Sequence, residues 1–288
     1  MTTTSTQDEA PVRVSGLRKT YAGSPAVDGI DLDIHTGEVF ALLGPNGAGK
    51  TTTVEMLEGY RRRDAGTVSV LGVDPSHPTP MWRSQIGIVL QSSSGSDELT
   101  VDELVHHYAG YYPDAREPDE VIAAVGLTSK RRTRSRHLSG GQRRRLDVAL
   151  GILGRPRLLF LDEPTTGFDP EARREFWDLI DGLADDHGTT IVLTTHYLDE
   201  AEHLADRVAV IVDGRIVAVD APALLAGREQ ESATVRWLED GAIRSVRSEV
   251  PTRTVHELAS RFDGEVPGLE IARPTLEETY LRLIGEQR

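Results

Sequence analysis

Short apolar runs alternate with helix-like patterns along most of this chain. Apolar and polar positions alternate over residues 12–33, with a turn at 22–25, which is typical of two strands. Residues 39–43 are all apolar and are followed by Gly-Pro-Asn-Gly, which favours a buried strand leading into a loop. Further strands are expected at residues 66–71, 86–90, 158–161 and 189–194, and a hairpin at 207–219 turning at Asp213-Gly214.

Helical patterns lie between these strands and decide the fold class. Helices are expected at residues 50–59, 139–153, 170–184 and 198–204. Strands that alternate with helices predict an α/β fold with a mostly parallel sheet and helices on both faces. Residues 97–136 lack strand patterns and carry two helical ones, at 101–111 and 118–125, so we interpret them as a helical insertion in this core.

The two ends of the chain differ from the core. Residues 1–10 are polar, lack the basic and apolar regions of a secretory signal, and are predicted to be a disordered tail. Beyond residue 220 the pattern suggests a helix at 221–227, a hairpin at 234–249 around Asp240-Gly241, and a final helix at 274–283. Residues 221–288 are therefore predicted to form a small α+β appendage, whose role the sequence leaves open.

Composition narrows the classes of partner. The 288 residues suffice for one large domain and a small appendage, and the absence of cysteine excludes disulfides and thiolate metal sites. A net charge of −14 disfavours a nonspecific grip on nucleic-acid phosphates, so no nucleic-acid partner is expected. No apolar stretch approaches the ~18 residues that a membrane-spanning helix needs. Any membrane role is therefore expected to come through a partner.

A glycine-rich loop follows the apolar run 39–43 and carries the clearest chemical signal. Residues 44–51 fit the spacing G-x-x-x-x-G-K-[ST], in which backbone N–H groups and a helix N-terminus converge on phosphate oxygens. Lys50 is expected to contact the β- and γ-phosphates of ATP, and the Thr51 hydroxyl to ligate Mg²⁺. The residues expected to bind nucleotide here are Gly44, Pro45, Asn46, Gly47, Ala48, Gly49, Lys50, Thr51 and Thr52.

An acidic pair follows the strand at 158–161. Carboxylates at the carboxyl end of a central strand lie where ligands bind in such sheets. Asp162 is expected to hold Mg²⁺ opposite Thr51, and Glu163 to polarise the attacking water as general base. By itself such a pair could equally be a solvated acidic turn, but the phosphate loop upstream favours catalysis.

A second glycine signature, Leu-Ser-Gly-Gly-Gln at residues 138–142, precedes another predicted helix. Without the other motifs, a capped helix start is the more common meaning of such a segment. Together with the phosphate loop and the Leu-Leu-Phe-Leu-Asp-Glu-Pro run, however, residues 12–220 resemble the ATP-binding-cassette family of phosphate-loop NTPases. The resemblance implies that this core also contains an antiparallel β subdomain. It also implies that Ser139, Gly140, Gly141 and Gln142 contact a nucleotide held by a second cassette, as in a homodimer.

The resemblance extends to four further positions. It implies that Tyr21 stacks on adenine and that Gln91 contacts Mg²⁺ and couples the cassette to its transport partner. Asp169 matches the loop that crosses the dimer interface, although Phe168 stands where the family usually has leucine. His196 matches the switch histidine that touches the γ-phosphate, which completes the expected catalytic set of Glu163, His196 and Lys50.

Two segments indicate which kind of cassette this is. The run from Thr195 to Glu202 and the closing Pro-Thr-Leu-Glu-Glu-Thr-Tyr-Leu-Arg-Leu resemble the drug and antibiotic exporters of the daunorubicin-resistance type. That branch implies an ATPase chain at the cytoplasmic face of the membrane, bound to a separate integral-membrane permease. The alternatives are a soluble cassette that remodels a macromolecule without a permease, and a nucleotide-dependent module that sequesters a drug.

Overall fold

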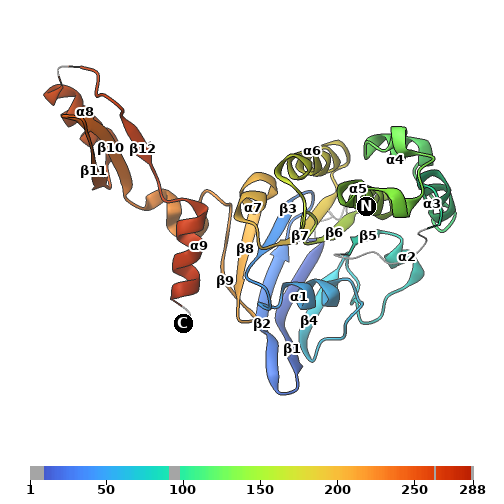
Figure 1. Cartoon of the computed structure of the whole chain (residues 1–288). Coiled ribbons are helices and arrows are strands. Elements are labelled where there is room, and N and C mark those ends of the chain that lie inside the picture. Colours follow the sequence, from blue (N-terminus) through green and yellow to red (C-terminus); the bar gives the residue numbers. More distant parts are fainter. Residues whose placement is uncertain (1–9, 91–97, 263, 287–288) are drawn as a thin grey trace, which may run out of the picture. The chain divides into compact units, whose positions relative to one another are not determined.

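The computed structural model describes residues 10–90, 98–262 and 264–286. Within them the chain forms two compact units, which divide between Val217 and Ala218. Figure 1 shows the first as layered sheets and helices, and the second as a small sheet with its own helices. Each unit is described here by itself.

A six-stranded sheet forms the centre of the first unit, in the order β5-β6-β7-β3-β8-β9. The pairs β5–β6, β6–β7, β7–β3 and β3–β8 are parallel, which confirms the predicted α/β core. Every residue of β3, β6 and β7 is buried, because layers cover both faces of the sheet. The strands are β3 (Val39–Leu43), β5 (Ile86–Val89), β6 (Leu158–Asp162), β7 (Thr190–Thr195), β8 (Arg207–Val212) and β9 (Arg215–Asp220).

A three-stranded antiparallel sheet covers one face of the central sheet. Its order is β2-β1-β4, with β1 spanning Val12–Tyr21, β2 Ser24–Ile34 and β4 Ala65–Val70. The inward side chains of this sheet join α1 (Lys50–Leu57) and alternate residues of the central strands, such as Phe40 and Leu42, in one apolar core. This packing fixes the start of α1 against the end of β3. The antiparallel subdomain that the family resemblance implies is thus present.

The helices of the first unit lie largely where periodicity predicts them. Two of them form the insertion, where Thr100 caps α3 in a capping box with Glu103. In Figure 1, α5, α6 and α7 lie on the other side of the central sheet from α1. The helices are α2 (Pro80–Arg83), α3 (Val101–Ala109), α4 (Pro118–Ala124), α5 (Gly140–Ile152), α6 (Pro170–His187) and α7 (Leu198–Leu204), with short 3-10 turns at Thr128–Lys130 and Ser135–His137.

The second unit is less like its prediction. The Asp240-Gly241 hairpin is confirmed, with both residues at positive φ, but the expected helix at 221–227 is wrong. That segment is a turn followed by a 3-10 helix, Leu225–Gln230, in which two left-handed residues interrupt the helical backbone. Neither α8 nor β12 was expected from the sequence pattern. The other elements are β10 (Ala233–Glu239), β11 (Ala242–Ser248), α8 (Pro251–Arg261), β12 (Glu270–Ala272) and α9 (Leu276–Gly285), with the sheet order β11-β10-β12.

Candidate nucleotide site

The glycine-rich loop joins the end of β3 to the start of α1, where backbone N–H groups point out of the helix. Gly49 has a φ of 103°, and a Cβ there would lie 2.2 Å from the Ala26 carbonyl oxygen, so only glycine fits. The loop borders a cavity of about 300 Å³. Its lining residues are Ala26, Asn46, Gly47, Gly49, Lys50, Thr51, Thr52 and Glu163. A helix N-terminus beside a cavity of this kind suits an anion such as a polyphosphate.

Lys50 brings a buried cation to this cavity. Its ammonium group donates hydrogen bonds to the carbonyl oxygens of Gly44, at 2.9 Å, and Pro45, at 3.2 Å. The same nitrogen lies 3.4 Å from a carboxylate oxygen of Glu163. Since the side chain is only 4% exposed, these contacts hold the charge in place beside the loop.

Asp162 ends β6 and faces the first turn of α1. The Thr51 hydroxyl lies 3.3 Å from both oxygens of its carboxylate. Thr194, at the paired position of β7, donates its hydroxyl hydrogen to the same carboxylate. A hydroxyl and a carboxylate this close are the hard oxygen donors that Mg²⁺ prefers, so the residues present fit the expected ion.

Glu163 follows directly and has a strained backbone. Its φ of 43° lies in the left-handed region, which a residue with a Cβ adopts at a cost. Its N–H donates to the carbonyl and hydroxyl oxygens of Thr194, at 3.2 and 3.0 Å. The structure thus holds this carboxylate at the cavity, although the turn itself is unfavourable.

His196 lies one residue beyond β7 and reaches the same carboxylate. Its Nδ1 is 3.4 Å from an oxygen of Glu163 but makes no hydrogen bond with any of the described residues. The ring also packs 4.1 Å from that of Tyr197, measured between centroids. The structure therefore brings together Lys50, Thr51, Asp162, Glu163 and His196 at one edge of the sheet.

A further acid lies behind this cluster. Glu58 follows the last turn of α1 and is 8% exposed. Burial, together with the negative charges of Asp162 and Glu55, raises the pKa of Glu58 to about 8. The Glu58 carboxyl group is therefore mostly protonated at neutral pH, which limits the negative charge behind the proposed metal ligands.

The signature segment begins α5. Ser139 caps the helix by accepting from the N–H of Gln142, whose side chain accepts in return from the N–H of Ser139. Gly140 and Gly141 occupy the first turn, where N–H groups lack partners within the helix. The segment is thus a preformed helix start with exposed donors, as an anion site requires.

Of the three remaining candidate residues, the structure describes Tyr21 and Asp169. Tyr21 ends β1 with a 40% exposed ring, and Lys19 and Arg61 place cations 5.6 and 5.4 Å from its centroid. Asp169 caps α6 by accepting from the N–H groups of Glu171 and Ala172. Gln91 lies outside the described residues.

The unusual Phe168 is well packed. Its ring lies edge-on to that of Phe176 on α6, with centroids 5.7 Å apart and planes at 90°. This is a favourable arrangement for two aromatic rings. Phenylalanine therefore fits at this position of the loop.

Two residues that hold the acidic pair in place, Thr194 and Arg144, were not expected from the sequence. Thr194 looks like any threonine of a buried strand, and its role follows only from its pairing with Asp162. Arg144 is the middle residue of three consecutive arginines, but it is 6% exposed and donates hydrogen bonds to backbone carbonyls around the pair. No local pattern marks either residue, because both act through neighbours that are distant in sequence.

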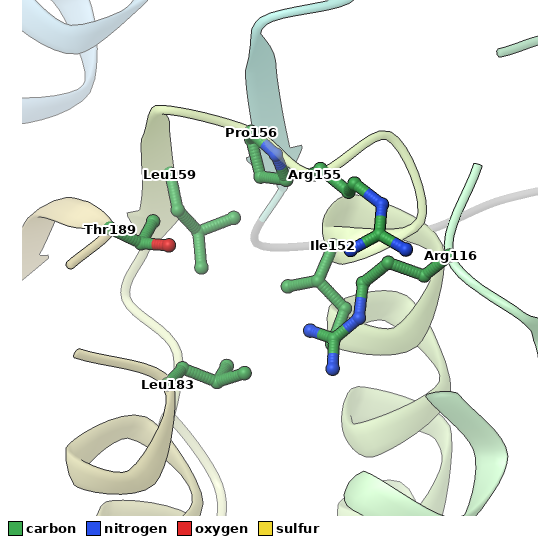
Figure 2. A pocket seen from close by; sticks show the side chains of 7 residues that line it. All are labelled: Arg116, Ile152, Arg155, Pro156, Leu159, Leu183 and Thr189. Carbon is green, nitrogen blue, oxygen red and sulfur yellow. The ribbon is translucent and has the colours of Figure 1, made fainter. Parts of the chain in front are cut away.

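A second cavity, of about 200 Å³, lies at the opposite edge of the sheet (Figure 2). It is lined by Arg116, Ile152, Arg155, Pro156, Leu159, Leu183 and Thr189. Pro156 and Thr189 precede β6 and β7, so this cavity borders the amino ends of the strands, whereas the candidate residues follow their carboxyl ends. It contains none of the predicted site residues.

Comparison with known proteins settles the family. The ABC transporter family matches residues 27–166. The daunorubicin/doxorubicin resistance ATP-binding protein DrrA of Streptomyces peucetius is 38% identical, over 97% of this chain and 94% of that protein. The chain belongs to the ATP-binding-cassette transporter family. The cassette is also 34% identical to the Nod factor export ATP-binding protein I of Burkholderia orbicola, over 96% of this chain and 98% of that protein.

Solved structures agree on the fold. A dimeric cassette in a post-hydrolysis state with ADP and Pi has a TM-score of 0.66 at 23% identity, over 73% of this chain and 98% of its own. The ATP-binding subunit of an ABC transporter has a TM-score of 0.68 at 21% identity, over 94% of this chain and 98% of its own. These likenesses and the family identify the cassette as a nucleotide-binding ATPase with the phosphate-loop NTPase fold.

No membrane-spanning helix occurs in the described parts of the cassette. None of the helices there is both long enough and apolar enough to cross a bilayer.

Proposed function

We propose that this cassette hydrolyses MgATP at a site shared by two copies of the chain and so drives export of a drug-like compound through a separate membrane permease. The observation that carries the chemistry is a cluster of five residues beside the phosphate loop: Lys50, Thr51 and Glu163 line the cavity, Asp162 contacts Thr51, and His196 lies beside Glu163. Phosphoryl transfer needs little beyond charge stabilisation, positioning and a base, and these residue types supply all three.

The roles follow from position. The loop residues 44–52 bind the phosphates of ATP through backbone N–H groups and Lys50. Thr51 and Asp162 would hold Mg²⁺, which neutralises charge on the β- and γ-phosphates. Glu163 accepts the proton of the water that attacks the γ-phosphorus, and His196 donates to a γ-phosphate oxygen. Tyr21 stacks on the adenine ring, and Gln91 is proposed as a further contact of the ion.

A second copy is proposed to complete the site. The phosphate loop and the signature are two separate helix starts in one chain, at α1 and α5. A head-to-tail pair would bring Ser139, Gly140, Gly141 and Gln142 of each copy onto the nucleotide of the other, with Asp169 at the crossing between copies. A solved relative of the same fold is dimeric, in a state with ADP and Pi.

Export through a separate permease is supported by the relatives. The resistance protein and the Nod factor export protein each align over nearly their whole length with this chain. A polytopic partner is proposed to bind the helical insertion and to hold the cassette at the cytoplasmic face of the membrane. The alternative is a soluble cassette that remodels a macromolecule, and no feature of the site favours it.

The glutamate role is tested by Glu163→Gln. The variant should keep ATP affinity, lose turnover by roughly 10²- to 10⁴-fold, and form an ATP-dependent dimer that is visible by size-exclusion chromatography with light scattering. Hydrolysis at the wild-type rate would refute the assignment of the base. Glu120→Gln, on the exposed start of α4, is the matched control and should leave both properties unchanged.

The partner is tested by pull-down of the tagged full chain from mild-detergent extracts of its native cells, with and without ATP. A stoichiometric polytopic membrane protein is the expected result. Recovery of ribosomal or DNA-bound material without any membrane protein would favour the soluble alternative and leave the ATPase chemistry intact.

A further inference from the structure

Arg144 makes an unusual set of contacts for an arginine two residues beyond the signature. It lies on α5 and is 6% exposed. Its guanidinium group donates to three backbone carbonyl oxygens: Nε to Pro164, at 3.0 Å, Nη2 to Asp162, at 2.7 Å, and Nη1 to Leu90. A planar guanidinium presents its donors in a fixed fork, so these three carbonyls are held in one arrangement.

Two of these carbonyls belong to Asp162 and Pro164, the residues on either side of Glu163. That residue has a φ of 43°, a left-handed conformation that persists only where its surroundings impose it. Thr194 holds the N–H of Glu163 from the side of β7, and Arg144 holds the flanking carbonyls from the side of α5. The backbone at the carboxylate is thus fixed from two directions.

The third carbonyl, that of Leu90, connects Arg144 to a further strand of the central sheet. Leu90 follows β5, directly before the segment that contains Gln91. One buried side chain therefore joins the helix of the signature to the end of β5 and to the end of β6. A displacement of α5 would be transmitted to the Glu163 backbone through hydrogen bonds rather than through loose packing.

We propose that Arg144 is a positioning residue that sets the orientation of the Glu163 carboxylate and couples it to the signature helix. This inference rests on the proposed role of Glu163 as the base. Within the described residues the guanidinium of Arg144 hydrogen-bonds to backbone carbonyls, so we expect it to act through Glu163 and not on the nucleotide. Turnover should therefore depend on Arg144 while nucleotide affinity should not.

The first test separates turnover from binding. Arg144→Gln shortens the side chain and removes the fork, so we expect kcat to fall roughly 10- to 100-fold, the range that small misplacements of catalytic groups produce. The Kd for a fluorescent ATP analogue should stay within about threefold of the wild type, since uniform binding is untouched. If Kd rises as much as kcat falls, the positioning role is wrong.

Arg145→Gln is the matched control. Arg145 is the next residue on the same helix, but it bonds to the Val125 carbonyl and to Glu175, away from the acidic pair. The melting temperature of Arg145→Gln should fall about as much as that of Arg144→Gln, but its kcat should stay at the wild-type value. Equal losses of kcat in both variants would show a general effect of loosening α5 and would overturn the proposal.

A double-mutant cycle supplies the decisive measurement. In single-turnover phosphate release with protein in excess, adding Arg144→Gln to Glu163→Gln should change the rate by less than about threefold, because both changes remove one function. Multiplicative losses would show that Arg144 acts independently and would refute the coupling. Failure of the proposed base is distinguishable, because Glu163→Gln alone would then turn over normally. If Arg144→Gln does not fold, Arg144→Lys replaces it in every comparison.

Discussion

The buried acid behind the site predicts a specific pH dependence of stability. Glu58 is 8% exposed and has a folded-state pKa of about 8, against an ordinary value of 4.5. Its folded form holds the proton more tightly than its unfolded form. The resulting stabilisation is complete below pH 4.5 and is lost as the pH rises towards 8. Glu58→Gln keeps the size and polarity of the neutral acid but removes its titration.

The magnitude follows from the two pKa values. Each unit of difference is worth about 1.4 kcal/mol, and the interval from 4.5 to 8 therefore allows at most about 5 kcal/mol. Most of the loss falls between pH 5 and pH 9, where we expect the free energy of unfolding to decrease by about 3–4 kcal/mol through this group alone. Other groups titrate over the same range, so the informative quantity is the difference between the wild type and Glu58→Gln.

The assay is urea unfolding followed by circular dichroism at pH values from 5 to 9, without nucleotide or Mg²⁺. The variant should equal the wild type within about 1 kcal/mol at pH 5 and exceed it by about 3 kcal/mol at pH 9. An exposed-acid control, Glu120→Gln, should run parallel to the wild type throughout. Parallel profiles for Glu58→Gln as well would refute the account of the buried proton.

Three further changes test individual contacts of the site. Lys50→Ala should weaken ATP binding roughly 10- to 100-fold in a fluorescence titration, because it removes a charged donor to the phosphates, and unchanged affinity would contradict that role. Thr194→Val should cost about 1–3 kcal/mol of stability in thermal or urea unfolding and lower kcat, since the carboxylate of Asp162 and the N–H of Glu163 lose a partner. Tyr21→Ala should weaken ATP binding by about 1–3 kcal/mol while leaving tripolyphosphate binding unchanged, and an equal loss for both ligands would exclude stacking.

Much of the first unit could be predicted because its signals are local. The burial of β3, which is wholly apolar, and of β6, which is apolar up to Asp162, follows from their own residues. The dipeptide Asp213-Gly214 likewise predicts its turn, which the structure forms with both residues at positive φ. The phosphate loop could also be recognised from the sequence. Its glycines meet a requirement of the backbone where the loop turns into the next helix. The family resemblance then supplied positions such as the signature, whose proposed partner is the nucleotide of a second copy.

The second unit was predicted less well for a physical reason. The segment 221–227 contains residues that favour a helix, but Ala226 and Gly227 adopt left-handed conformations that end it after a single turn. The helix α8 was overlooked although Val255, Leu258, Ala259 and Phe262 recur at helical spacing, because its other residues are mostly polar and only Leu258 is buried. Its packing against Val235 and Trp237 appears only once β10 is in place.

The contacts of the acidic pair, Asp162 and Glu163, could not be predicted from the sequence, because they depend on how two strands pair. Parallel pairing of β6 with β7 places Asp162 opposite Thr194, and that register alone lets one hydroxyl serve both the carboxylate of Asp162 and the N–H of Glu163. A slip of one residue would turn every side chain of β7 to the other face and remove the contact. The register is held by apolar residues of the core, such as Ile191 and Leu193, which are fully buried. The catalytic geometry is therefore a consequence of core packing, and substitutions in that core should alter turnover before they unfold the chain.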